Sequence, residues 1–127
     1  MRVCLGGTFE VIHPGHRSLL RKAMDMGDSV TIGVTSDDFA RRGREYAPAP
    51  ARDRMEAVVA YIAMHYPGRR TDIVEIGDRS GVALEPDYDA IVVSGQTREN
   101  ALLLNDERVK RGLKPLRVVV AGTVYAD

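Results

Sequence analysis

Residues 6–16, GGTFEVIHPGH, carry the side chains best suited to chemistry in this chain. After the two glycines come Thr8 and then two histidines, His13 and His16, three positions apart. In α/β proteins, glycines between a strand and a helix let backbone N–H groups approach a phosphate. Two histidines on the first turn of a helix share a face and can donate to anionic oxygens, helped by the helix dipole. The segment therefore predicts a site for a phosphoryl or nucleotidyl group.

The same segment contains no nucleophile paired with a base, which argues against a covalent intermediate. Its histidine pair is also compatible with a metal site or a polar helix cap. The metal alternative is weak, because the remaining histidine, His65, lies in another predicted helix. We therefore expect no resident metal, and catalysis by positioning and electrostatic stabilisation.

The composition is that of one globular domain. The chain has 127 residues, of which 44% are hydrophobic, and its 18 basic and 18 acidic residues cancel to zero net charge. A neutral chain argues against nucleic acid as a partner. Cys4 is the only cysteine, which excludes an internal disulfide and fits the cytoplasm, and no apolar run reaches the length of a membrane span. We expect a cytoplasmic protein with neither nucleic acid nor membrane as a partner.

Five apolar, β-rich runs alternate with helical patterns. We expect strands at 2–5, 30–35, 72–76, 90–94 and 117–121, and helices at about 14–26, 51–66 and 97–112. The runs VTIGVT and LRVVVAG are continuously apolar, as in strands covered on both faces. The order predicts a β-α-β-α-β-α-β-α-β chain that forms a doubly wound parallel sheet.

Ligands of such sheets bind at the carboxyl ends of the strands. Three segments of interest meet this condition: 6–16 after the first strand, RRGREYAPAP (41–50) after the second, and 94–97 after the fourth. The second segment, rich in Gly, Pro and charge, is expected to be a mobile loop. Its arginines either contact phosphate or are solvated, and the sequence favours the two equally.

Other basic residues have structural alternatives. Arg54 stands at the start of the 51–66 helix, where it reaches a phosphate or pairs with Asp53 or Glu56. The end of the 97–112 helix predicts a solvated basic face, made by Arg108, Lys110, Arg111 and Lys114. The side chains expected to face the core from the 51–66 helix are Met55, Val58, Val59, Ile62 and Ala63.

The segment GTFEVIHPGH resembles the (G)TF(D/E)xxHxGH signature of the HxGH nucleotidyltransferase superfamily. Further along, GVTSDDFARR, DRMEAVVAYI, DAIVVSGQT and RGLKPLRVVV are similar, in this order, to segments of archaeal-type pantetheine-phosphate adenylyltransferases. The resemblance implies a Rossmann-like nucleotidyltransferase fold with strand order 3-2-1-4-5 in one domain, residues 1–127. It also implies adenylyl transfer from ATP to 4′-phosphopantetheine, assisted by Mg²⁺, giving dephospho-coenzyme A and pyrophosphate in coenzyme A biosynthesis.

The same resemblance implies roles for individual residues. His16 would stabilise charge on the α-phosphate, Thr8 would position the attacking phosphate or the α-phosphate, and His13 would contact the phosphates of ATP. The full nucleotide-binding set is Gly6, Gly7, Thr8, Phe9, His13, Gly15, His16, Gly95, Gln96 and Arg98, with Arg41, Arg42 and Arg44 in the phosphate loop.

The sequence departs from the family pattern in two places. Family members continue after the fifth strand into an ISSTxIR-like segment that binds the β- and γ-phosphates, whereas this sequence stops at Tyr125-Ala126-Asp127. The loop after the second strand carries arginines where the family often has lysine. We therefore expect a domain without that C-terminal segment. A glycerol-3-phosphate cytidylyltransferase, an FAD synthetase and a non-catalytic nucleotide-binding module stay open as alternatives.

Overall fold

Nine helices and strands make up the part of the chain that the computed structural model describes, residues 1–10, 12–42 and 47–122. In chain order they are β1 (Arg2–Gly7), α1 (Pro14–Met26), β2 (Ser29–Thr35), α2 (Asp37–Arg41), α3 (Ala51–His65), β3 (Arg70–Ile76), β4 (Ala90–Val93), α4 (Arg98–Lys110) and β5 (Arg117–Val120). All five predicted strands are present, and their bounds differ from the predicted ones by at most two residues.

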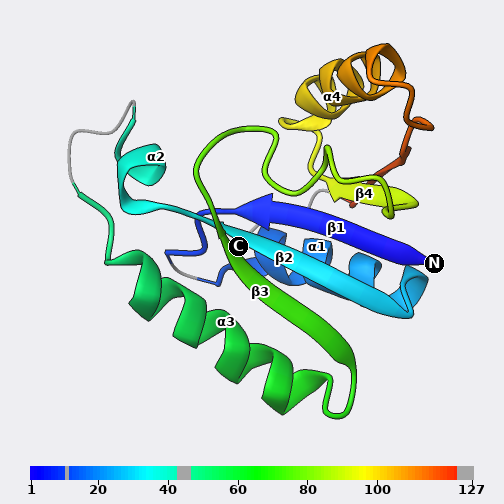
Figure 1. Cartoon of the computed structure of the whole chain (residues 1–127). Helices are drawn as coiled ribbons and strands as arrows, with labels where there is room; N and C mark the ends of the chain where they lie inside the picture. Colours follow the sequence, from blue (N-terminus) through cyan, green and yellow to red (C-terminus); the bar gives the residue numbers. More distant parts are fainter. Residues whose placement is uncertain (11, 43–46, 123–127) are drawn as a thin grey trace.

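The strands form one parallel sheet in the order β3-β2-β1-β4-β5, as predicted (Figure 1). The central strand β1 pairs with β2 on one side and with β4 on the other. The chain order therefore reverses at β1, and in open α/β sheets ligands bind outside the carboxyl end of the strands at this switch point. The segment that follows β1 is the one with the two histidines.

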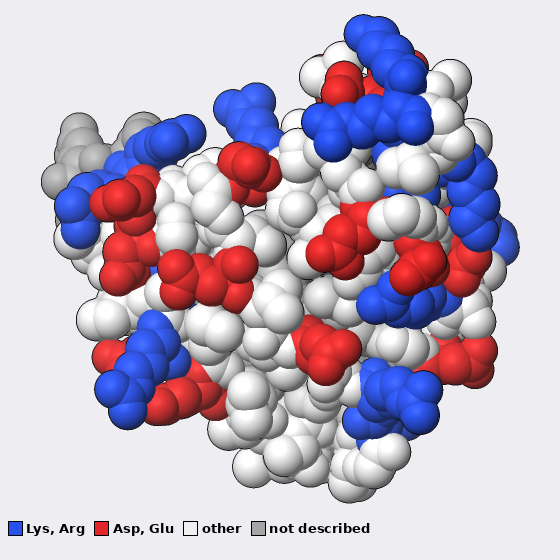
Figure 2. All heavy atoms as spheres, in the orientation of Figure 1, with Lys and Arg blue, Asp and Glu red and all other residues white. Residues whose placement is uncertain are grey.

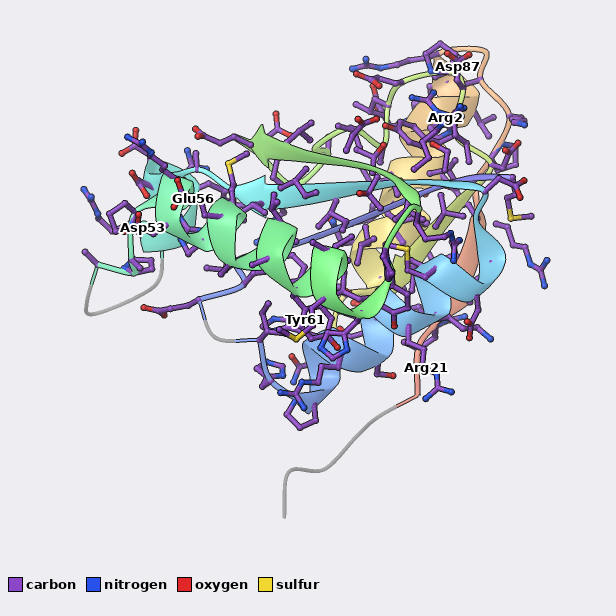
Figure 3. The ribbon with its side chains drawn as sticks, turned by 90° about the horizontal axis from the view of Figure 1, so that it is seen from below. Arg2, Arg21, Asp53, Glu56, Tyr61 and Asp87 are labelled. Carbon is purple, nitrogen blue, oxygen red and sulfur yellow. The ribbon has the colours of Figure 1, made fainter. Side chains whose placement is uncertain are left out.

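Helices cover both faces of the sheet, which makes the fold doubly wound. On one face, α1 and α3 pack against side chains that include Val3 and Leu5, and these two helices lie side by side in Figure 3. On the other face, α4 packs against Cys4 and Ile91. Successive residues of β1 thus enter different cores, which explains why its sequence is continuously apolar.

The connection between β3 and β4 differs from the prediction. The alternating β-α pattern predicted from the sequence implies a helix between these two strands, but residues 77–89 form turns without a helix. Ala83 and Tyr88 from this segment are buried and cover the sheet where the helix was expected. Tyr88 donates a hydrogen bond of 2.9 Å to the Thr31 hydroxyl. The segment GDRSGVALEPDYD has too many glycines, prolines and charges to sustain a helical apolar stripe.

Arg108 contradicts the prediction of a solvated side chain, because none of its surface is exposed. Its guanidinium donates to the carbonyls of Ala83 and Glu85 at 2.7 Å each and to that of Lys114 at 2.8 Å. It therefore supplies the donors that the turns between β3 and β4 lack. The other three basic residues of that face are exposed, as predicted: Lys110, Arg111 and Lys114.

The inward face of α3 is narrower than predicted. Val58 and Ile62 are buried and Met55 packs against the core, but Val59 is 50% exposed and Ala63 is exposed as well. The helix contacts the sheet mainly through β2 and β3, so a single stripe of its surface is covered.

Candidate active site

The turn after β1 is built around Phe9. This residue has a left-handed backbone, with φ of 51°, and its ring is fully buried in the core. A Cβ at Gly7 would lie 2.9 Å from that ring, so only glycine fits there. Since the Phe9 side chain is inside the protein, any contact from this residue to a nucleotide comes from its backbone.

His13 caps the first turn of α1. Its Nδ1 accepts hydrogen bonds from the backbone N–H groups of Gly15, at 3.0 Å, and His16, at 3.3 Å. A nitrogen that accepts carries no proton, so the neutral ring holds its proton on Nε2 and donates from that atom. The cap therefore fixes the tautomer and makes Nε2 a hydrogen-bond donor at the amino end of the helix.

Three rings fix the place of His16. The His13 and His16 rings are stacked with centroids 3.7 Å apart and an angle of 19°, and the Phe9 ring lies 4.8 Å from that of His16 on a tilt. A ring anchored in the core thus supports the second histidine, which in turn supports the first. The structure brings both predicted histidines together at the carboxyl end of β1.

Thr8 is tied to β2 and α3. Its hydroxyl accepts a 3.2 Å hydrogen bond from Thr35, and its carbonyl accepts one of 3.0 Å from the Arg54 guanidinium. Arg54 is only 1% exposed, so it neither reaches a phosphate in solvent nor uses its neighbours Asp53 and Glu56, which lie on the outer surface of α3 (Figure 3). Neither role predicted for Arg54 is correct: it is a buried structural partner of Thr8.

The arginines of the predicted phosphate loop follow β2. Arg41 and Arg42 are exposed at the end of α2, which lies beyond the carboxyl ends of β1 and β2 (Figure 1). The Arg42 guanidinium is 5.9 Å from the centre of the Phe39 ring. Arg44 lies outside the described residues. Figure 2 shows basic side chains at the α2 end and over α4, interspersed with acidic ones, so the visible face has no continuous basic surface.

The third segment joins β4 to α4. Ser94 and Thr97 close its turn, because the Ser94 N–H donates to the Thr97 hydroxyl at 3.1 Å. Gly95, Gln96 and Arg98 are exposed, and a Cβ at Gly95 would meet no atom within 4 Å. This turn leaves open space beside Gly95, at the edge of the sheet where the carboxyl ends of β1, β2 and β4 lie.

Metal-binding groups are sparse in the described part of the chain. No cluster of three or more His, Cys, Asp and Glu side chains able to hold a metal ion occurs there. Enzymes of phosphoryl transfer usually bind Mg²⁺ through one or two carboxylates together with the phosphates of their substrate.

Comparison with known proteins defines the class. The family model described as cytidylyltransferase-like matches residues 4–124. The chain belongs to this family and is a nucleotidyltransferase, in agreement with the resemblance of its first motif.

Individual relatives are more specific. The phosphopantetheine adenylyltransferase of Methanopyrus kandleri is 43% identical over 94% of this chain and 76% of the relative. That of Pyrobaculum aerophilum is 42% identical over 96% of this chain and 79% of the relative. A crystal structure of a protein with unknown function from Archaeoglobus fulgidus matches with a TM-score of 0.88 and 35% identity, over 99% of this chain and 96% of that chain.

Proposed function

We propose that this protein transfers the adenylyl group of ATP to 4′-phosphopantetheine, forming dephospho-coenzyme A and pyrophosphate in coenzyme A biosynthesis. The observation that carries the chemistry is the capped turn after β1, where His13 presents a donor at Nε2 beside His16. The choice of acceptor is supported by the archaeal relatives named phosphopantetheine adenylyltransferase, which match nearly the whole chain.

The reaction is a direct displacement. A phosphate oxygen of 4′-phosphopantetheine forms a bond to the α-phosphorus of ATP, and the bond from that phosphorus to the bridging β-oxygen breaks, so that pyrophosphate leaves. Negative charge grows on the α-phosphate oxygens, and preorganised donors stabilise it. No enzyme nucleophile is required. Cys4 is unsuited to that role, because burial in the sheet raises the pKa of its thiol to about 12.

Each segment of the carboxyl edge has a part in this proposal. His16 donates to the α-phosphate as charge develops, Thr8 positions the reacting phosphate, and His13 donates from Nε2 to the phosphates of ATP. The arginines after β2 neutralise phosphate charge, which suits their bidentate geometry. The open turn after β4 takes the adenine and ribose through Gly95, Gln96 and Arg98.

ATP enters this proposal as its Mg²⁺ complex, because Mg²⁺ neutralises charge on the phosphates in phosphoryl transfer. We place the reaction in the cytoplasm, supported by a lone buried cysteine. No helix among the described residues has the length and apolarity to cross a membrane.

Pyrophosphate release with three substrate pairs tests the proposal. The pairs are Mg²⁺-ATP with 4′-phosphopantetheine, CTP with glycerol 3-phosphate, and ATP with FMN. We expect turnover with the first pair. Turnover with only one of the other pairs would make the acceptor assignment wrong, and ATP binding without turnover in any pair would identify a non-catalytic nucleotide-binding module.

A further inference from the structure

Arg54 brings a full positive charge into the protein interior directly beneath the Thr8 turn. Its side chain is 1% exposed, and all three of its guanidinium nitrogens donate. Nε donates to the Ala49 carbonyl at 2.6 Å, Nη1 to the Thr8 carbonyl at 3.0 Å and the Thr35 hydroxyl at 3.1 Å, and Nη2 to the Asp37 carboxylate at 3.2 Å. A buried charge is tolerated when it is paired and fully hydrogen-bonded in this way.

The acceptors of Arg54 come from segments that are far apart in the sequence. Thr8 follows β1, Thr35 ends β2, and Asp37 opens α2, the helix whose last residue is Arg41. Asp37 also accepts a 2.7 Å hydrogen bond from the N–H of Ala51, the first residue of α3. One charge pair therefore joins the turn after β1, the start of α2 and the start of α3.

The hydroxyl of Thr35 links Arg54 to the hydroxyl of Thr8 by hydrogen bonds. It accepts from Arg54, so its single hydrogen is available to donate, and it donates to the Thr8 hydroxyl oxygen at 3.2 Å. The Thr8 hydroxyl hydrogen must then point away from Thr35. Arg54 thus fixes the Thr8 carbonyl directly and the direction of the Thr8 hydroxyl through one intermediate.

We propose that Arg54 is a positioning residue of the transfer reaction. Acting through Thr8, Thr35 and Asp37, it holds the turn after β1 and the α2 segment in a fixed position relative to each other. This inference rests on the proposed function, in which Thr8 contacts phosphates of the same substrates as Arg41, the last residue of α2, and Arg42, which follows it. A lysine has one nitrogen on a flexible stem and cannot make these four bonds from a planar group. Replacing Arg54 by lysine should therefore loosen the turn after β1 and the α2 segment together.

The chain offers a matched control in Arg108. This arginine is also fully buried, and it too is held by backbone carbonyls, those of Ala83, Glu85, Pro86 and Lys114. It lies in the last turns of α4, whereas the turn proposed to bind adenosine precedes the first turn of that helix. Arg54→Lys and Arg108→Lys therefore make the same chemical change in equally buried places, but only one of them is beside the site.

The test compares kcat and KM of the full chain and both variants, each corrected for its folded fraction. We expect Arg54→Lys to lower kcat/KM by roughly tenfold or more, since small displacements of positioned groups have effects of this size. Arg108→Lys should change kcat/KM by less than twofold, although its melting temperature falls to a similar extent. Equal losses of activity in the two variants would overturn the proposal, because burial alone would then explain both.

A second variant and a second readout protect the test against misfolding. Thr35→Val keeps the shape of the side chain but removes the hydroxyl between Arg54 and Thr8, and should lower kcat by about threefold to tenfold, the range that loss of one hydrogen bond supports. Unchanged kcat in this variant would contradict the link through Thr35. Backbone hydrogen exchange is measured in parallel on peptides covering 6–10 and 36–42.

Exchange in these two peptides separates this inference from the proposed function. Arg54→Lys should accelerate exchange in both peptides, and Arg108→Lys in neither. If the parent protein turns over none of the three substrate pairs, the proposed function fails while exchange still decides the role of Arg54. Unchanged exchange in the Arg54→Lys peptides would refute the positioning role even in an active enzyme.

Discussion

Replacing Gly15 by alanine tests the cap that orders the first turn of α1. A Cβ at this position would lie 2.8 Å from Cε1 and 3.1 Å from Nδ1 of His13. Gly15 does not have a positive φ, so the clash with the imidazole is the main source of strain. The ring must move, and with it go the two hydrogen bonds that Nδ1 accepts and the stacking on His16.

The structure sets the size of the effect. Loss of a side-chain cap costs about 0.5–2 kcal/mol of stability. In a chain of 127 residues, each kcal/mol lowers the melting temperature by about 4 °C, so we expect a fall of roughly 2–8 °C. A domain with ordinary stability, about 5–15 kcal/mol, stays folded at 25 °C after such a loss. Displacement of the two histidines should nevertheless lower kcat/KM by roughly tenfold to a hundredfold.

Thermal unfolding and pyrophosphate release, measured on the same preparations, check both numbers. Gly77→Ala is the control, because a Cβ at Gly77 meets no atom within 4 Å and this residue follows the edge strand β3, which β2 separates from β1. The control should leave both quantities near those of the parent protein. A Gly15→Ala protein with the parent melting temperature and with kcat/KM within twofold of the parent would refute the role of the cap.

Two further predictions concern protonation. The backbone N–H of Arg2 and the Lys114 ammonium hold the pKa of Asp89 below its usual range. The ionised carboxylate therefore stabilises the fold at pH values above about 4, the ordinary pKa of an aspartate. This stabilisation is lost as the pH falls below that value. Urea unfolding between about pH 5 and pH 2 should therefore depend less on pH in Asp89→Asn than in the parent or in Asp72→Asn, and equal slopes would contradict this. Because burial raises the pKa of Cys4 to about 12, its thiol should react with a disulfide reagent at pH 8 only as fast as the protein unfolds, whereas rapid labelling of the native protein would show that the thiol is accessible.

The sheet was predictable because its signals are local. Val3, Cys4 and Leu5 form a continuous apolar run because β1 is covered on both faces. Glycines and prolines after most of the apolar runs mark where strands and helices end. The turn with the two histidines could be placed at the carboxyl edge of the sheet for the same reason. The role of His13 as the N-cap of α1 was only one of several alternatives for the histidine pair. A histidine N-cap has no sequence signal beyond its spacing to Gly15.

The buried arginines were not predictable from local sequence. Arg54 and Arg108 both stand in highly charged segments, RDRME (52–56) and DERVKR (106–111), so each pattern favours a solvated position. Their acceptors, such as the carbonyls of Thr8 and Ala83, are backbone groups from distant segments, and the side-chain pattern does not show which carbonyls are left without donors. The irregular segment between β3 and β4 and the burial of Arg108 depend on each other, because the buried arginine donates hydrogen bonds to the carbonyls of that segment.

The central claim is that His16 stabilises charge that develops on the α-phosphate during adenylyl transfer to 4′-phosphopantetheine. Its most direct test measures dephospho-coenzyme A formation by His16→Ala together with the Kd for Mg²⁺-ATP. We expect kcat to fall by roughly a hundredfold or more and the Kd to change by less than about threefold, because the hydrogen bond is strongest in the transition state. Equal losses in kcat and in ATP binding would show that His16 is only a ground-state ligand, and an unchanged kcat would contradict the claim outright.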